Sequence, residues 1–156
     1  MDSDNTRSDN NKAELPLFPL NMVLMPNMPI PLHIFEERYK IMIGSCIVEE
    51  KPFGVLLIKE GPEVGEGAKP FSTGTTAHID QVERLPDGRI NIIAHGQRRF
   101  HLINSIETFP YLTGVIEYIP ETDGIITEEI LATAQTLFAE YKQGIASLQG
   151  GWVSQA

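Results

Sequence analysis

Apolar and polar positions change period several times along the chain, and each change marks an expected element. The stretch 15–35 is apolar but is interrupted by five prolines: Pro16, Pro19, Pro26, Pro29 and Pro31. A helix does not tolerate so many prolines, whereas extended segments at edges or bulges do. The pattern predicts strands over 15–18, 22–25 and 28–34. A turn is expected at Pro26 and Asn27, since asparagine tolerates positive φ.

A helical period follows directly. Tyr39, Ile43, Cys46 and Ile47 recur at the spacing of one helix face. Two acidic residues precede them, where the helix dipole favours negative charge. One helix over 36–50 is expected.

The middle of the chain contains short β patterns separated by turns. Strands are expected over 53–59, 76–84, 89–95, 99–106 and 111–119. A glycine- and proline-rich loop fills most of 61–75, and the sequence Leu85-Pro-Asp-Gly88 is a hairpin signal. Six or more short strands of this kind favour a closed or partly closed barrel.

A last helix is expected to begin after Thr127, a residue type preferred at N-caps. Its apolar stripe comprises Ile130, Leu131, Ala134, Leu137, Phe138, Tyr141, Ile145 and Leu148. The stripe requires a covering surface, either the strands or a second chain. Two glycines at 150 and 151 should end the helix.

These elements divide the chain into four parts. Residues 1–13 are polar and are expected to be a disordered, acidic tail. Residues 14–120 should form a β-domain, 121–149 a C-terminal helix, and 150–156 a short tail. The predicted class is mainly β with helices (α+β), with one inserted helix and one C-terminal helix.

Charge and cysteine content narrow the possible functions. The 156 residues include 12 Lys and Arg against 21 Asp and Glu, so the formal charge is 12 − 21 = −9. Such a chain is repelled by nucleic acid phosphates and by anionic membranes. The N-terminus lacks the apolar run of a signal peptide, and Cys46 has no internal cysteine partner. A cytoplasmic protein is expected.

Catalytic signatures are weak throughout. The segment from Gly61 to Pro70 has glycines and Lys69, but Ala68 precedes the lysine and Pro70 follows it, which a phosphate-binding P-loop does not allow. The four histidines lack zinc-ligand spacing, although convergence of His33 and His78 from different strands stays open. No catalytic residue, cofactor or metal is expected.

An apolar cluster is the strongest candidate for binding. Met22, Met25 and Met28 recur every three residues around the turn, with Phe18 just before them. Methionine suits surfaces that bind varied partners, so these four residues are a candidate peptide-binding patch. The alternative is that the methionines fill gaps in a proline-rich core.

Longer motifs carry a family resemblance. The segments Glu14–Leu20 (ELPLFPL), Val23–Pro26 (VLMP) and Pro29–Glu36 (PIPLHIFE), then Arg38 and Tyr39, resemble the opening of the Lon amino-terminal domain. Further matches are Gly54 to Leu56, Gly74 to Ala77, Gly96 with Arg99 and Phe100, and Pro110 with Tyr111. The structural motif residues are Pro19, Pro29, Pro31, Phe35, Glu36, Arg38, Tyr39, Gly96, Arg99 and Phe100. Asn27 stands where the family often has glycine.

The resemblance implies a PUA-like β-barrel followed by helices. It also implies a domain that engages unfolded proteins without catalysis of its own, in bacteria. The ATPase and Ser-Lys protease modules of Lon are not expected, so the chain resembles a stand-alone Lon-domain protein. The preferred function is binding of unfolded or apolar polypeptide, linked to a protease system.

Two other functions stay open. A scaffold would dock one folded partner, or a second copy, through Leu137, Phe138, Tyr141 and Ile145. RNA binding follows from PUA-like architecture by analogy alone, and the charge of −9 opposes it.

Overall fold

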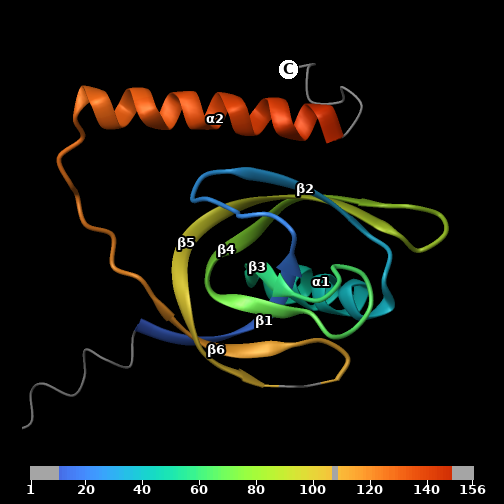
Figure 1. The fold of residues 1–156 in the computed structure, drawn as a ribbon. Coiled ribbons are helices and arrows are strands. Elements are labelled where there is room, and N and C mark those ends of the chain that lie inside the picture. Colours follow the sequence, from blue (N-terminus) through green and yellow to red (C-terminus); the bar gives the residue numbers. More distant parts are fainter. Residues whose placement is uncertain (1–10, 107–108, 149–156) are drawn as a thin grey trace, which may run out of the picture. The chain divides into compact units, whose positions relative to one another are not determined.

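The structure is a computed structural model that describes residues 11–106 and 109–148. Its elements are β1 (Lys12–Leu20), β2 (Pro29–Ile34), α1 (Glu37–Glu49), β3 (Phe53–Glu60), β4 (Lys69–Arg84), β5 (Ile90–Ile106), β6 (Thr113–Tyr118) and α2 (Glu128–Leu148) (Figure 1). The residues up to Pro120 form one compact unit and those from Glu121 a second. Lys12 and Ala13 belong to β1, so the disordered tail expected over 1–13 extends too far; its first ten residues and the tail expected over 150–156 lie outside the described residues.

Five of the strands close into a barrel. Neighbouring strands follow the order β5-β4-β3-β1-β6, and β6 pairs again with β5. β1 and β3 run parallel, with Leu17 opposite Gly54, and the other pairs are antiparallel. The predicted α+β class with a barrel is therefore confirmed.

The β4–β5 hairpin extends beyond the closed barrel, and β2 lies along it (Figure 1). Pro29 stands opposite His95 and Pro31 opposite Ile93. Within the part of the chain that the structure describes, β2 pairs with β5 alone, so its other edge carries no strand. The two prolines of β2 thus occupy an edge strand, where the missing N–H is tolerated.

Three further details differ from the sequence prediction. The segment 22–25 is not a strand, because its backbone groups bond to a side chain and to a turn rather than to a ladder. The expected strands 89–95 and 99–106 are one strand, β5, whose register shifts beside Gly96. β4 begins at Lys69, so the loop before it is shorter than expected.

The larger apolar core lies between α1 and the sheet. α1 buries Tyr39, Met42, Ile43 and Cys46, which confirms the predicted helix face apart from the half-buried Ile47. The Phe18 ring stacks on Tyr39, with ring centroids 4.0 Å apart and planes 7° from parallel. The proline-rich opening strand is therefore fixed to the helix that follows it.

A smaller core fills the other part of the barrel. It consists of Leu15, Leu17, Leu56, Phe100 and Ile116. The Phe100 ring fits because two strand positions beside it are glycine. A Cβ on Gly54 would stand 2.8 Å from this ring and one on Gly74 2.7 Å from it. The motif residue Phe100 therefore acts as interior packing.

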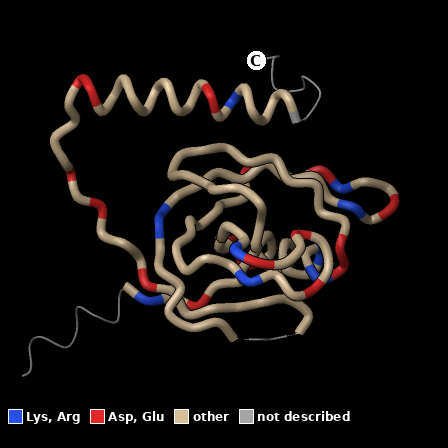
Figure 2. Tube along the Cα trace, in the orientation of Figure 1, with Lys and Arg blue, Asp and Glu red and all other residues tan. Residues whose placement is uncertain are grey.

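The second unit is built around α2, and its predicted N-cap is confirmed. The Thr127 hydroxyl oxygen accepts a hydrogen bond from the Ile130 N–H at 3.2 Å. Figure 2 shows acidic residues along the segment that leads into this helix. Glu128 and Glu129 occupy the first turn, where the dipole favours them.

Candidate functional site

Residues 21–28, here called the methionine loop, are fixed to the barrel by backbone and side-chain hydrogen bonds. The Thr75 hydroxyl donates to the Leu24 carbonyl at 2.7 Å in a buried position. The Asn27 N–H donates to the Gly96 carbonyl at 2.8 Å, and the Gly96 N–H donates to the Met28 carbonyl at 2.9 Å. Asn27 has φ 64°, so the expected positive-φ turn is present. These hydrogen bonds hold the backbone of the loop in one conformation on the barrel.

The three methionines are not equally accessible. Met25 is 62% exposed, whereas Met22 and Met28 are half-buried against the larger core. Phe18 is 6% exposed because Tyr39 covers it, so its place in an exposed patch is wrong. Only Met25 offers most of its side chain to a partner.

An open hollow of about 380 Å³ lies beside Met25. We call it the Met25 hollow. Most of its lining is apolar, and its walls come from the methionine loop and from β3, β4 and β5. The lining residues are Val23, Leu24, Met25, Pro26, Val55, Leu57, Thr73, Gly74, Thr75 and Arg99. Arg99 was expected as a motif residue, and no sequence signal placed it beside the methionines.

The motif residues Glu36 and Arg38 fasten a neighbouring loop. The Glu36 carboxylate accepts a hydrogen bond from the Gly65 N–H at 3.0 Å and pairs with Arg38 at 3.3 Å. Arg38 also donates to the Gly65 carbonyl. From the same loop, the Glu63 carboxylate accepts the Asn21 N–H at 2.7 Å. Glu36 and Arg38 thus hold the loop that carries Glu63, and Glu63 in turn bonds to Asn21 at the start of the methionine loop.

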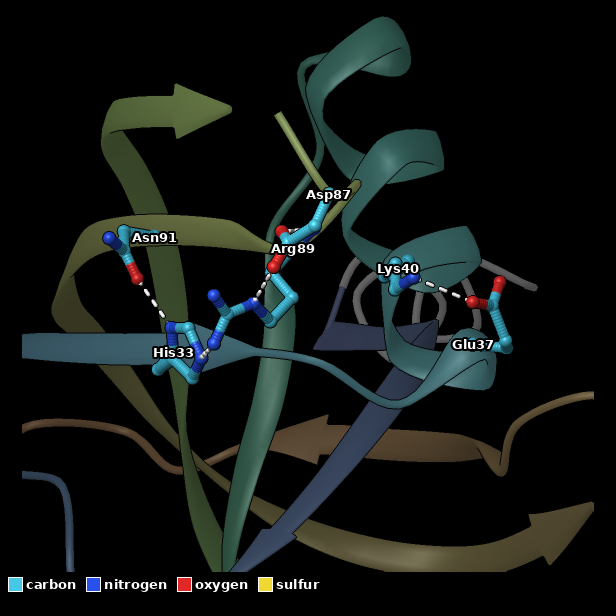
Figure 3. Close-up of polar contacts among 6 residues, drawn as sticks. All are labelled: His33, Glu37, Lys40, Asp87, Arg89 and Asn91. Carbon is cyan, nitrogen blue, oxygen red and sulfur yellow. Dashed lines mark hydrogen bonds and ion pairs between the residues drawn. The ribbon is translucent and has the colours of Figure 1, made fainter. Parts of the chain in front are cut away.

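A second hollow of about 360 Å³ lies over β2, β4 and β5. Polar side chains beside it bond to one another (Figure 3). His33 Nδ1 lies 2.6 Å from the Asn91 side-chain oxygen, and Arg89 Nη1 lies 3.4 Å from His33 Nε2. Arg89 Nε also donates to Asp87 at 2.5 Å. These groups satisfy one another.

The groups that could support catalysis or metal binding are scattered. His33 stands opposite Asn91 on β5 and His78 stands opposite His95 further along the same strand, so the two histidines left open above do not meet. Among the described residues there is no cluster of His, Cys, Asp or Glu that could hold a metal ion.

Cys46 is buried on α1, as its position on the apolar face indicated. Burial, with a smaller effect of the nearby Glu49 carboxylate, raises the pKa of its thiol to about 11. Because the thiolate is the nucleophilic form, this cysteine is unreactive at neutral pH.

The alternative docking residues lie on α2. Leu137 is 59% exposed, Phe138 57% and Tyr141 42%, while Ile145 is half-buried. Phe138 and Tyr141 have ring centroids 6.5 Å apart. These residues form an accessible apolar stripe.

None of the described helices combines the length and apolar character needed to cross a membrane.

Comparison with known proteins gives one consistent result. The family model of the ATP-dependent protease La (LON) substrate-binding domain matches residues 14–152.

Individual relatives agree with that match. The Lon protease of Parabacteroides distasonis is 34% identical over 110 residues, which are 69% of this chain and 13% of that protein. The Lon protease of Escherichia coli K12 is 27% identical over 134 residues, 83% of this chain and 17% of that protein. The chain therefore spans less than a fifth of the length of these relatives.

Solved structures show the same fold. The crystal structure of a Lon N-terminal domain protein from Xanthomonas campestris is similar with a TM-score of 0.64 and 32% identity, over 78% of this chain and 70% of that one. The N-terminal domain of Mycobacterium avium complex Lon protease is similar with a TM-score of 0.54 and 20% identity, over 90% of this chain and 71% of that one. The latter likeness is one of fold alone.

Proposed function

Because the chain belongs to the Lon substrate-binding domain family, we propose that it binds unfolded or exposed apolar polypeptide in the cytoplasm and presents it for ATP-dependent proteolysis. The matched region is the substrate-binding part of Lon rather than its catalytic part. Binding without chemistry is therefore the function assigned to these residues.

The observation that carries this proposal is the exposed Met25 beside an apolar hollow. The hollow has about 380 Å³, a size in the range of sites for small ligands or single peptide side chains. Methionine is flexible and polarizable, so one such side chain can pack against many different apolar groups. A loop whose backbone is fixed, and which presents the flexible Met25 side chain, suits a protein that binds varied sequences.

The hydrogen bonds of the methionine loop support the same function. Because Thr75 and Gly96 hold the loop backbone, binding does not require the loop to be ordered first. Lower ordering cost leaves more of the apolar contact energy for affinity. Met25 and Val23 remain accessible while Leu24, between them, anchors the loop in the core.

The test is fluorescence anisotropy of a labelled, permanently unfolded protein titrated with this chain. A folded protein of similar negative charge is the control probe. We expect saturable binding of the unfolded probe alone. If a sample shown to be folded binds neither probe, the proposed function is wrong.

The site is tested with Met25→Gln, which keeps the length of the side chain and removes its apolar end. Loss of about 1 kcal/mol of apolar contact corresponds to roughly fivefold weaker binding. The matched control is Val48→Gln on α1, where an 82% exposed apolar side chain lies away from the hollow lining. Equal affinity of Met25→Gln and wild type would remove Met25 from the site.

A second candidate function is docking of one dedicated folded partner through α2. Exposed Leu137 and Phe138 on the apolar stripe favour it. The partner is then a protein with its own apolar groove, bound as helix in groove. Deletion of residues 127–156 would abolish that binding and leave the affinity for the unfolded probe unchanged. Loss of both affinities on deletion would instead assign α2 to client binding.

A further inference from the structure

We propose that α2 pairs in antiparallel orientation with the α2 of a second copy of this chain, so that the protein forms a dimer. The inference goes beyond the proposed function and does not depend on it. It concerns the apolar stripe of α2, where Leu131, Leu137 and Phe138 are each at least half exposed. An exposed apolar stripe of this length marks a surface that another element covers.

The stripe follows a seven-residue repeat. Leu131, Phe138 and Ile145 are seven residues apart. Ala134 and Tyr141 occupy the second apolar position of the same repeat. This is the pattern of helices that pack against one another along their length. The partner that fits the stripe is therefore another helix with the same repeat, which a second copy supplies.

Side-chain size favours the antiparallel orientation. In the register that places Phe138 of one copy beside Ala134 of the other, a large side chain lies against a small one. The same register places Ile130 beside Gly144, where a Cβ would meet nothing within 4 Å in the single chain. A parallel pair would set Phe138 against Phe138 and Ala134 against Ala134, which packs unevenly.

Charge fits the same register. It places Glu128 of each copy beside Lys142 of the other, so that two opposite-charge pairs form in each dimer. Lys142 lies beside the stripe already, because its Nζ is 5.2 Å from the centroid of the Phe138 ring. In the part of the chain that the structure describes, neither Glu128 nor Lys142 has an ion-pair partner. A parallel pair would bring the acidic first turns of both copies together, where Glu128 and Glu129 repel their counterparts.

The contact is small, which sets the strength of the expected dimer. Two helices that overlap over residues 128–144 share about 25 Å of length. Such a contact is smaller than a standard protein interface, and small interfaces are typical of weak complexes. We therefore expect a dimer that dissociates in the micromolar range.

Sedimentation equilibrium of the full chain over a range of concentrations tests for the dimer. We expect a monomer–dimer equilibrium for wild type and a monomer for Phe138→Asp, which places a charge in the centre of the stripe. Far-UV circular dichroism checks that both proteins are folded. A wild type that stays monomeric through the micromolar range would overturn the proposal and leave the stripe to a folded partner. A Phe138→Asp protein that dimerises as wild type does would place the interface elsewhere.

Charge exchange tests the register. Glu128→Lys and Lys142→Glu each place like charges at both ends of the interface, so each should weaken the dimer roughly tenfold at low salt. An equimolar mixture of the two variants has opposite charges at both ends and should dimerise about as tightly as wild type. The matched control is Glu140→Lys, with the same charge change at an exposed residue outside the stripe. If Glu128→Lys weakens the dimer no more than Glu140→Lys does, the register is wrong.

A short bismaleimide cross-linker tests the orientation. The single cysteine of the chain, Cys46, is buried and does not interfere. Gln135→Cys lies near the centre of the antiparallel pair and faces its own counterpart, so a cross-linked dimer is expected. Ile130→Cys lies about 20 Å along the helix from its counterpart and should stay uncross-linked. Cross-linking of both variants would show a parallel pair and overturn the proposed arrangement.

Discussion

Replacing Gly96 with alanine tests whether the methionine loop is held as the structure describes. A Cβ at this position would stand 2.1 Å from the Met25 carbonyl oxygen and 3.2 Å from the Leu24 side chain. Ordinary contacts between such atoms are about 3.5 Å, so the loop must move by roughly 1 Å or more. Both obstacles belong to one loop, and the first is backbone, which cannot turn aside as a side chain can.

The cost follows from the hydrogen bonds that this movement breaks. Three are affected: Asn27 N–H to Gly96 carbonyl, Gly96 N–H to Met28 carbonyl, and Met28 N–H to Met25 carbonyl. At about 1 kcal/mol each, their loss lowers the free energy of unfolding by about 3 kcal/mol. Partial uncovering of the buried Leu24 would add to this loss.

Urea unfolding followed by far-UV circular dichroism measures the effect. Gly44→Ala is the matched control, since Gly44 lies in α1 and a Cβ there would meet nothing within 4 Å. That variant should gain about 0.5–1 kcal/mol, because alanine is the better helix former. If Gly96→Ala unfolds within 0.5 kcal/mol of wild type, as measured with an unchanged m-value, the described attachment of the loop is refuted.

Three further predictions concern single groups. Thr75→Val should lower the free energy of urea unfolding by about 1–3 kcal/mol, because it leaves the buried Leu24 carbonyl without its donor, while the exposed Thr73→Val should be nearly neutral. The raised pKa of Cys46 stabilises the fold fully below pH 9.0, and this contribution is lost as pH rises to about 11. The unfolding free energy of wild type should therefore fall more steeply over that window than that of Cys46→Ala; equal slopes would contradict the burial effect. Thr127→Ala should cost the first turn of α2 about 1 kcal/mol, seen as faster amide hydrogen exchange there, and unchanged exchange would disprove the cap.

Local signals in the sequence were enough for most of the fold. Prolines excluded a helix at the start, the spacing of Tyr39, Ile43 and Cys46 placed α1, and Thr127 marked the start of α2. The continuity of β5 was missed because glycine at 96 reads as a break in a strand pattern. In the structure Gly96 leaves room for the methionine loop, which packs directly against it. This contact joins segments that are distant in sequence, so no local pattern could predict it.

The candidate site was less accessible to sequence reasoning. Spacing drew attention to the methionines, but their exposure depends on which neighbour covers each one. Phe18 is hidden by Tyr39, and Met25 is left open, through contacts between segments distant in sequence. Arg99 joins Met25 at one hollow only because β4 lies between β3 and β5.

The unpaired edge of β2 has a consequence for self-assembly. An open edge can pair with further extended chains, and under the proposed function this protein meets such chains. In β2, alternation aims the backbone of Pro29 and Pro31 away from β5, and neither residue has an N–H to offer there. At these two positions an incoming strand would find acceptors without donors. Pairing with another strand is therefore disfavoured at this part of the edge, which lowers the tendency of the protein to stack into fibrils.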